Sequence, residues 1–339
     1  MKKKKIALVV DADNWAFANI ANAIVKYVDK YDFEIFPLSY FHNNLLKLYI
    51  AAKDCDLIHF FWRESVIQLD SNEDYAWLAR QLGMTGIEEF KSKYVDNKII
   101  STAVYDHMFT ETEQEKTKEI FSKCSNYYVS SQILKDIYDN MGLKYKPKCV
   151  ITDGVNLDEF YPKNEDRFKN IKKRNLVIGW VGNSEWNADK EDFKGVNTIL
   201  KPAIKELQKE GYPIEMYFAD RKERMIPHDQ MIDYYSKIDV LICTSKNEGT
   251  PNPVMEAMAC GVPFISTRVG IVPEVSGKKQ SEYILKERTK VCLKEAIVKY
   301  LDNLGSIEDL RKENSKQIKN WSWEKVTKRF ENFFDDCFK

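Results

Sequence analysis

The chain has 339 residues, a length that suits two domains better than one compact domain. Hydrophobic residues make up 44% and charged residues 31%, an ordinary globular composition with enough apolar material for two cores. The 52 basic residues balance the 52 acidic ones, which argues against general nucleic-acid binding. No stretch approaches the roughly 18 apolar residues of a membrane span. The seven cysteines form no C-x-x-C pair, which predicts reduced thiols and a cytoplasmic location.

The chain opens with a lysine run at residues 2–5, which resembles the charged start of a secretion signal. Only Ile6 to Val10 follow before Asp11, far too few apolar residues for such a signal. We interpret the lysines as a solvated entry into the first strand. A peripheral contact with anionic lipid at the inner membrane face is the alternative that stays open.

The first half of the chain alternates short apolar runs with helical patterns. Helical spacing appears around residues 20–28 and 45–52. The predicted strands are 6–10, 33–38, 57–62, 99–104, 127–129 and 149–151. This alternation predicts a parallel sheet with helices on both faces.

Residues 162–175 are polar, charged and begin with a proline, and we interpret them as a linker between two domains. After them the alternation starts again. The predicted strands are 176–181, 214–219, 240–244 and 264–267, and the predicted helices are 197–210, 228–237, 254–260, 289–304, 307–319 and 323–338. The chain is therefore expected to be an α/β protein with two doubly wound, Rossmann-like domains. The predicted boundaries are 1–165, 166–318 and a final helical segment at 319–339. Ligands of such domains bind beyond the carboxyl ends of the strands, facing the gap.

Two glutamates follow the strand predicted at 240–244. Gly249 allows a ligand to approach the backbone next to Glu248, and Pro253 suits the first turn of a helix that Gly261 ends. The free amides of that helix start can bind a diphosphate. Glu256 would then accept hydrogen bonds from a ribose diol, and Glu248 from the hydroxyls of a sugar. The plainer alternative is that Glu256 stabilises the helix start and Glu248 is a loop charge.

The pair Glu248-x(7)-Glu256 is followed by the string A-M-A-C-G-V-P and by Thr267-Arg-Val-Gly270-x-x-x-Glu274. This combination resembles the signature of retaining glycosyltransferases of the two-domain GT-B class, family four, also called group 1 glycosyltransferases. Residues 152–162 and 320–324 resemble weaker motifs of the same family. The resemblance implies a cleft between the domains and a C-terminal helix that packs back on the first domain. It also implies a nucleoside-diphosphate sugar as donor, with neither metal nor cofactor.

The resemblance implies catalytic roles for Glu248, Lys194 and His107. It implies a first domain that takes the acceptor and a second that binds the donor. The family's diphosphate-binding arginine has no clear counterpart, because Asn183 and Ser184 stand in its place, and Arg268 is the candidate substitute. The expected donor-binding residues are Glu256, Gly182, Asn183, Ser184, Gly249, Thr250, Pro251, Asn252, Pro253, Val254 and Arg268. The expected acceptor-side residues are Asp13, Asn14, Trp15, Trp62 and Arg63.

The implied reaction moves a sugar to an acceptor hydroxyl with retention of anomeric configuration, in bacterial surface polysaccharide or glycoconjugate synthesis. Glycan, lipid-linked and protein acceptors all stay open, as do the base, the sugar and the oligomeric state. Asp11-Ala12-Asp13 is also a D-x-D, the metal-binding pair of the other glycosyltransferase class. A nucleotide-sugar epimerase, an inverting transferase and a non-catalytic nucleotide-sugar-binding protein share the architecture. A dinucleotide-dependent oxidoreductase should carry G-x-G-x-x-G after a strand, and this chain does not.

Overall fold

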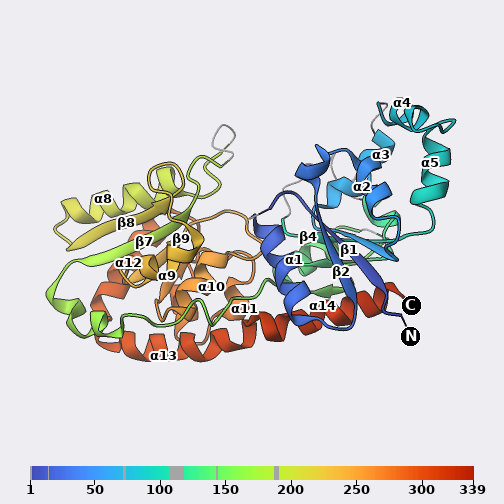
Figure 1. Cartoon of the computed structure of the whole chain (residues 1–339). Coiled ribbons are helices and arrows are strands. Elements are labelled where there is room, and N and C mark those ends of the chain that lie inside the picture. Colours follow the sequence, from blue (N-terminus) through green and yellow to red (C-terminus); the bar gives the residue numbers. More distant parts are fainter. Residues whose placement is uncertain (1, 14, 72–73, 107–117, 143, 187–190) are drawn as a thin grey trace. The chain divides into compact units, whose positions relative to one another are not determined.

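The computed structural model describes residues 2–13, 15–71, 74–106, 118–142, 144–186 and 191–339. It divides into two compact units (Figure 1). Unit 1 consists of the chain up to Thr152 together with Trp323–Lys339, and unit 2 is Asp153–Ser322. The division therefore comes earlier than the predicted boundary at residue 165, and the last helix belongs to unit 1.

Unit 1 is built on a six-stranded parallel sheet in the order β2-β1-β3-β4-β5-β6. The strands are β1 Lys5–Val10, β2 Asp32–Pro37, β3 Leu57–Phe60, β4 Ile99–Val104, β5 Asn126–Val129 and β6 Cys149–Val150. β1 lies between β2 and β3, so the strand order reverses there. Such a reversal is the switch point beside which open α/β sheets bind ligands.

Helices complete unit 1 on two apolar cores. On one core α1 packs against α14, with Ile20, Ile24, Phe330 and Phe334 buried. The other core lies under the remaining helices. The helical elements are α1 Ala16–Tyr27, η1 Leu38–Phe41, α2 Leu45–Ala51, η2 Arg63–Val66, α3 Gln68–Ser71, α4 Asp74–Gln81, α5 Ile87–Tyr94, α7 Gln132–Asn140 and α14 Trp323–Cys337. The helices between β3 and β4, and α7, were not predicted from the sequence.

Unit 2 holds a four-stranded parallel sheet in the order β10-β9-β7-β8. The strands are β7 Leu176–Gly182, β8 Ile214–Asp220, β9 Val240–Cys243 and β10 Phe264–Ser266. The α-helices are α8 Lys201–Lys209, α9 Met231–Tyr235, α10 Asn252–Ala259, α11 Val272–Val275, α12 Lys290–Asp302 and α13 Ile307–Ile318. The other helical segments are η3 Glu165–Lys173, η4 Val196–Leu200, η5 His228–Gln230, η6 Gln280–Tyr283, η7 Leu304–Ser306 and η8 Lys319–Trp321. The predicted pair of Rossmann-like α/β domains is confirmed.

The interpretation of residues 162–175 as a linker is wrong. Phe168 and Ile171 of η3 are buried in the core of unit 2. Arg167 and Arg174 pair with the buried Asp239 at 2.7 and 2.6 Å. Because apolar residues of the segment are buried and these two arginines are neutralised on the body of the unit, its polar composition does not mark an exposed connection.

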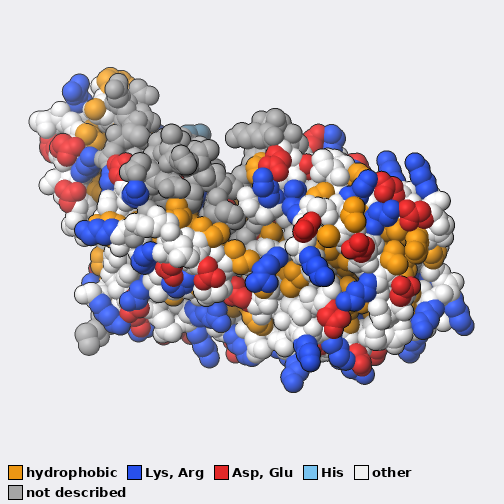
Figure 2. All heavy atoms as spheres, turned by 180° about the vertical axis from the view of Figure 1, so that it is seen from behind, with side chains coloured by type: hydrophobic (Ala, Val, Ile, Leu, Met, Phe, Trp, Pro, Cys, Tyr) orange, Lys and Arg blue, Asp and Glu red, His pale blue; other side chains and the backbone are white. Residues whose placement is uncertain are grey.

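The N-terminal lysines lie against acidic groups of unit 1. Lys4 pairs with Asp56 at 3.1 Å, and Lys5 pairs with Glu34 at 2.6 Å. On the face drawn in Figure 2, lysine and arginine side chains are interspersed with acidic ones, in keeping with the balanced net charge. All seven cysteines are unpaired. Among the described residues, no helix is both long enough and apolar enough to cross a membrane.

Candidate functional site

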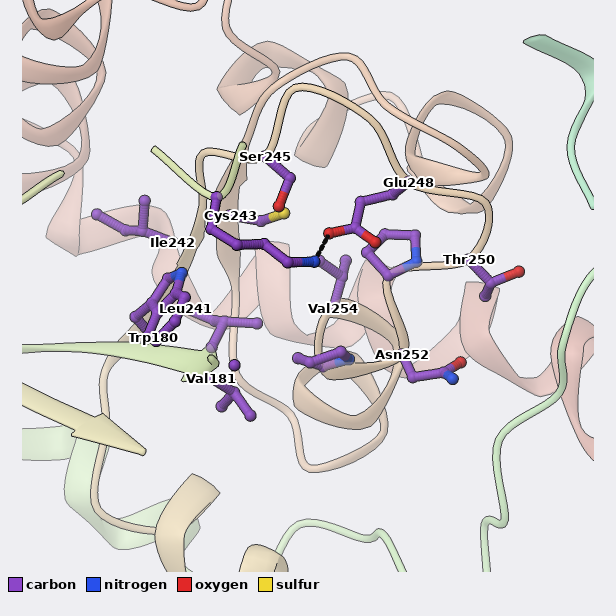
Figure 3. Close-up of a pocket in the computed structure, with 14 residues that line it drawn as sticks. Trp180, Val181, Leu241, Ile242, Cys243, Ser245, Glu248, Thr250, Asn252 and Val254 are labelled. Atoms are coloured by element: carbon purple, nitrogen blue, oxygen red, sulfur yellow. Dashed lines mark hydrogen bonds and ion pairs between the residues drawn. The ribbon is translucent and has the colours of Figure 1, made fainter. Parts of the chain in front are cut away.

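A pocket of about 170 Å³ opens at the carboxyl ends of β7 and β9 in unit 2 (Figure 3). Its floor is apolar, and its rim carries a lysine, a glutamate and the start of α10. The lining residues are Trp180, Val181, Gly182, Lys194, Leu241, Ile242, Cys243, Ser245, Glu248, Thr250, Pro251, Asn252, Pro253 and Val254. This is the position that the doubly wound topology predicts for a ligand.

A glycine fixes Lys194 at the rim of this pocket. Gly195 has a φ of +68°, and a Cβ there would lie 2.6 Å from the carbonyl oxygen of Thr244. Only glycine fits this left-handed conformation and close approach. The Thr244 hydroxyl donates to the carbonyl oxygen of Lys194 at 2.8 Å, which ties the segment to the end of β9. The backbone around Lys194 is therefore held on both sides.

Lys194 forms an ion pair with Glu248 across the pocket mouth. Lys194 Nζ lies 2.6 Å from Glu248 Oε1, and the two side chains are 24% and 19% exposed (Figure 3). Lys194 Nζ also lies 5.3 Å from the ring centroid of Trp186, within cation–π range. Because the pair is partly exposed, an incoming anion can reach the lysine and compete with the carboxylate.

The start of α10 lines the pocket, but its first backbone amides are already engaged. Pro251 precedes the helix without a side-chain cap, and Pro253, which has no N–H, lies in its first turn. Asn252 N–H donates to the carbonyl oxygen of Thr250 and Val254 N–H to that of Pro251, each at 2.9 Å, so the prediction of free amides at this helix start is wrong. The helix N-terminus still carries partial positive charge, which favours anions. The loop before the helix is held by Gly270, because a Cβ at Gly270 would collide with the carbonyl of Gly249. Ile271 N–H donates to that same carbonyl at 3.2 Å.

Glu256 lies in α10 outside the residues that line the pocket. The Tyr235 hydroxyl donates to Glu256 Oε2 at 2.6 Å, and His228 Nε2 lies 3.9 Å from Glu256 Oε1. The carboxyl side chain is 14% exposed, and burial raises its pKa above the ordinary value. One carboxylate oxygen therefore has a firm partner, and the other has only a distant one.

The structure separates the remaining donor-side candidates. Gly182 lines the pocket, whereas Asn183 and Ser184 do not. The Asn183 side chain accepts from Glu185 N–H at 3.1 Å, and Ser184 N–H donates to Asp220 at 3.2 Å. Gly249 and Arg268 are also absent from the lining, and Arg268 is exposed. Lys194 is thus the basic side chain among the lining residues.

Asp153 was missed by the sequence analysis. It is 4% exposed and contacts two lining residues, since Asn252 Nδ2 donates to Asp153 Oδ2 at 3.2 Å and Asp153 N–H donates to Thr250 Oγ1 at 3.2 Å. Burial raises the pKa of its carboxyl to about 7. A signal was present in the sequence: the family motif that residues 152–162 resemble has asparagine at the position of Asp153, so this chain departs from it there.

The carboxyl ends of the unit 1 strands carry the predicted acceptor-side residues. Arg63 is buried and donates to Asp106 at 3.0 Å, and it also pairs with Glu64. The Tyr40 hydroxyl donates to Asp13. Trp15 and Trp62 are 56% and 42% exposed.

Two predicted residues, His107 and Asn14, lie outside the described residues. In the D-x-D alternative, Asp11 accepts from Ala12 N–H at 2.9 Å, and burial raises its pKa. Its companion Asp13 is the acceptor of the Tyr40 hydroxyl.

Part of the chain is similar to known glycosyltransferases. Residues 201–321 match the model of the family "Glycosyl transferases group 1". The chain is 39% identical over 75 residues to a putative teichuronic acid biosynthesis glycosyltransferase of Bacillus subtilis, covering 22% of this chain and 19% of that protein. It is 33% identical over 232 residues to an uncharacterized glycosyltransferase of Methanocaldococcus jannaschii, covering 62% and 59%. The chain thus spans less than two thirds of the length of both relatives.

A solved structure shares the fold over the whole chain. Anabaena HepE in complex with UDP and glucose has a TM-score of 0.69 and 14% identity, and covers 98% of this chain and 99% of its own. At that identity the likeness concerns the fold, which is GT-B.

Proposed function

Residues 201–321 belong to the group 1 glycosyltransferases on a GT-B fold, and from this premise we propose that the chain transfers a sugar from a nucleoside-diphosphate donor to an acceptor hydroxyl. The observation that carries the proposal is the Lys194–Glu248 pair beside the open start of α10. One cation beside the positive end of a helix suits a diphosphate, and one carboxylate beside them suits sugar hydroxyls.

The donor would break the ion pair as it binds. The diphosphate pairs with Lys194 next to the positive end of α10, which releases Glu248 to accept hydrogen bonds from the sugar. Glu256 would accept from the ribose diol through the oxygen that Tyr235 leaves available. Donor binding would thus replace the Lys194–Glu248 ion pair with three contacts: Lys194 to the diphosphate, Glu248 to the sugar and Glu256 to the ribose.

The proposed chemistry stabilises the leaving diphosphate. As the glycosidic bond breaks, negative charge develops on the phosphate oxygens and positive charge on the sugar carbon. Lys194 and the loop before α10 are fixed in advance by Gly195 and by Gly270, so the lysine and the helix dipole can stabilise that charge with little reorganisation. No carboxylate among the lining residues besides Glu248 is a candidate nucleophile, and Glu248 is used for orientation. We therefore propose front-face transfer with retention, in which the leaving phosphate helps to deprotonate the acceptor.

Unit 1 would supply the acceptor side, through the exposed Trp15 and Trp62. The name of the Bacillus relative supports an acceptor in bacterial surface polysaccharide. Glycan, lipid-linked and protein acceptors remain alternatives within this proposal, and no metal is assigned a role in it.

A thermal-shift screen against UDP-, GDP-, ADP- and CMP-sugars tests the proposal. A ligand at ~100 times its Kd stabilises a fold by about 2.7 kcal/mol, so the matching nucleotide should raise the Tm clearly. NMR of the product then reports the anomeric configuration. If none of the four classes raises the Tm, or if the product is inverted, the proposed donor or the proposed retention is wrong.

A further inference from the structure

A buried carboxylic acid supports the start of α10 from behind. In Figure 3 the side chains of Thr250 and Asn252 point away from the ion pair that Glu248 makes. Both contact Asp153 there, since Asp153 N–H donates to Thr250 Oγ1 and Asn252 Nδ2 donates to Asp153 Oδ2, each at 3.2 Å. Thr250, which lies just before the helix, and Asn252, its first residue, are therefore held by one aspartate.

This contact leaves two buried oxygens unsatisfied. Among the described residues, Asp153 Oδ1 and Asn252 Oδ1 have no hydrogen-bond partner. Both are acceptors when the carboxyl is ionised, so neither can satisfy the other. Leaving a buried acceptor without a donor is unfavourable.

One proton on Asp153 removes the conflict. A protonated Oδ1 can donate to Asn252 Oδ1 while Oδ2 keeps accepting from Asn252 Nδ2, as in a paired carboxylic acid and amide. The neutral acid also avoids placing a negative charge behind the helix start that would bind a diphosphate. Geometry and charge thus favour the same protonation state.

The charged groups around Asp153 are already engaged. Glu248, on the loop with Thr250, pairs with Lys194, and Glu256 on α10 accepts from Tyr235 with His228 farther away. Asp158 and Glu159, farther along the segment of Asp153, are exposed. Burial, opposed by the bond from Asn252, raises the pKa of Asp153 to about 7.

We propose that Asp153 is a positioning residue that, as the neutral acid, fixes Thr250 and Asn252 for the diphosphate of the donor, and that its ionisation weakens donor binding. This inference rests on the proposed function of the pocket. It adds a residue and a pH dependence that the family resemblance does not supply.

The test compares UDP binding by calorimetry at about pH 6 and about pH 8.5. For the unaltered chain, Kd should rise about thirtyfold over this range, because the protonated, binding-competent fraction falls as the acid ionises. Asp153→Asn keeps a neutral side chain that can donate, so its Kd should vary far less with pH. Asp153→Ala should bind more weakly at both pH values, and the exposed Asp158→Asn should behave like the unaltered chain. Ionisation of UDP itself is common to all variants and cancels in the comparison.

Equal pH profiles for the unaltered chain and Asp153→Asn would overturn the proposal. A second readout needs no ligand. As the pH rises from about 4 to about 7, the Tm of the unaltered chain should fall relative to that of Asp153→Asn. The reason is that the folded chain keeps the proton of Asp153 while the unfolded chain releases it. If UDP binds at no pH, the donor is not a UDP-sugar, and the Tm comparison still decides whether Asp153 is held neutral.

Discussion

The carboxyl ends of the strands carry different kinds of side chain in the two units. In unit 2 the edge keeps a lysine, a glutamate and a helix start on the wall of a pocket. In unit 1 the charged groups at the edge are engaged within the unit, as Arg63 with Asp106 and Asp13 with Tyr40, and large aromatic rings stay exposed. The first edge suits a charged ligand, and the second suits the apolar face of a ring.

The difference extends to how the edges are held. In unit 2 the backbone at Gly195 packs closely against that of Thr244, and the backbone at Gly270 against that of Gly249. The polar groups of the pocket therefore have little freedom to reorganise. Preorganised polar groups are what stabilisation of a developing charge requires. We infer that chemistry resides at the unit 2 edge, and that the unit 1 edge contributes mainly binding.

The largest expected effect comes from removing the pocket's lysine. Lys194→Ala should lower the turnover of donor by roughly 10²–10³, the usual loss when one preorganised donor to a leaving group is removed. Donor binding should weaken less than turnover, because the positive end of α10 and the contacts to the nucleotide remain. Steady-state kinetics with the donor found by the screen measures both.

Lys201→Ala is the matched control for this change. Lys201 is 23% exposed and pairs with Glu223 at 3.0 Å, much as Lys194 pairs with Glu248, but it does not line the pocket. If Lys201→Ala and Lys194→Ala reduce turnover equally, the assignment of the leaving-group site to this edge is wrong.

Removing the second glutamate should affect binding rather than chemistry. Glu256→Ala deletes charge-assisted hydrogen bonds worth about 1.5–3 kcal/mol, so the nucleotide Kd should rise by roughly tenfold to a hundredfold. Tyr235→Phe, which leaves Glu256 in place without its 2.6 Å partner, should raise the Kd less. Calorimetry with the nucleotide alone measures both variants, and an unchanged Kd for Glu256→Ala would contradict the ribose role.

The two edges also differ in how far the sequence reveals them. The motif Glu248-x(7)-Glu256 is local, so the sequence predicted the loop and the helix. Lys194 was predicted through the family resemblance, and its pairing with Glu248, 54 residues away, was not predicted. Asp153 was not predicted because its role depends on a contact with Asn252, 99 residues later in the chain. No rule of residue spacing predicts such a contact. The linker interpretation failed for a related reason, since charge composition cannot show that Arg167 and Arg174 meet a buried aspartate. In unit 1 the strands were predicted well, but the short helices between β3 and β4 have too few turns to show a clear period.

A buried histidine makes the stability of unit 1 sensitive to acid. His59 in β3 is fully buried, and burial lowers its pKa to about 3, against 6.5 for an exposed histidine. Between these values the unfolded chain binds a proton that the folded chain excludes. His59 should therefore contribute a fall in the free energy of unfolding of about 1.4 kcal/mol per pH unit as the pH drops below ~6.5.

Substitution separates this contribution from those of other groups. His59→Asn can keep the hydrogen bond that Nδ1 shares with Ser101 at 2.9 Å, and it cannot be protonated. Its stability should fall less steeply between about pH 6.5 and pH 4, whatever its absolute value. His42→Asn, at an exposed histidine of the same unit, is the control and should keep the slope of the unaltered chain. Identical slopes for all three in urea unfolding would contradict the role of His59.

The smallest expected effect concerns the aromatic edge of unit 1. Trp62 is 42% exposed and follows β3, where an acceptor ring could stack on it. An exposed ring contact is worth about 0.5–1.5 kcal/mol, so Trp62→Ala should raise the acceptor KM by roughly twofold to tenfold. Hydrolysis of the donor by water, which uses only the unit 2 edge, should stay unchanged. Trp77→Ala removes a ring that is 58% exposed on α4, away from the strand ends, and should alter neither quantity. A loss of donor hydrolysis in Trp62→Ala would show that the two edges do not divide the work as their chemistry indicates.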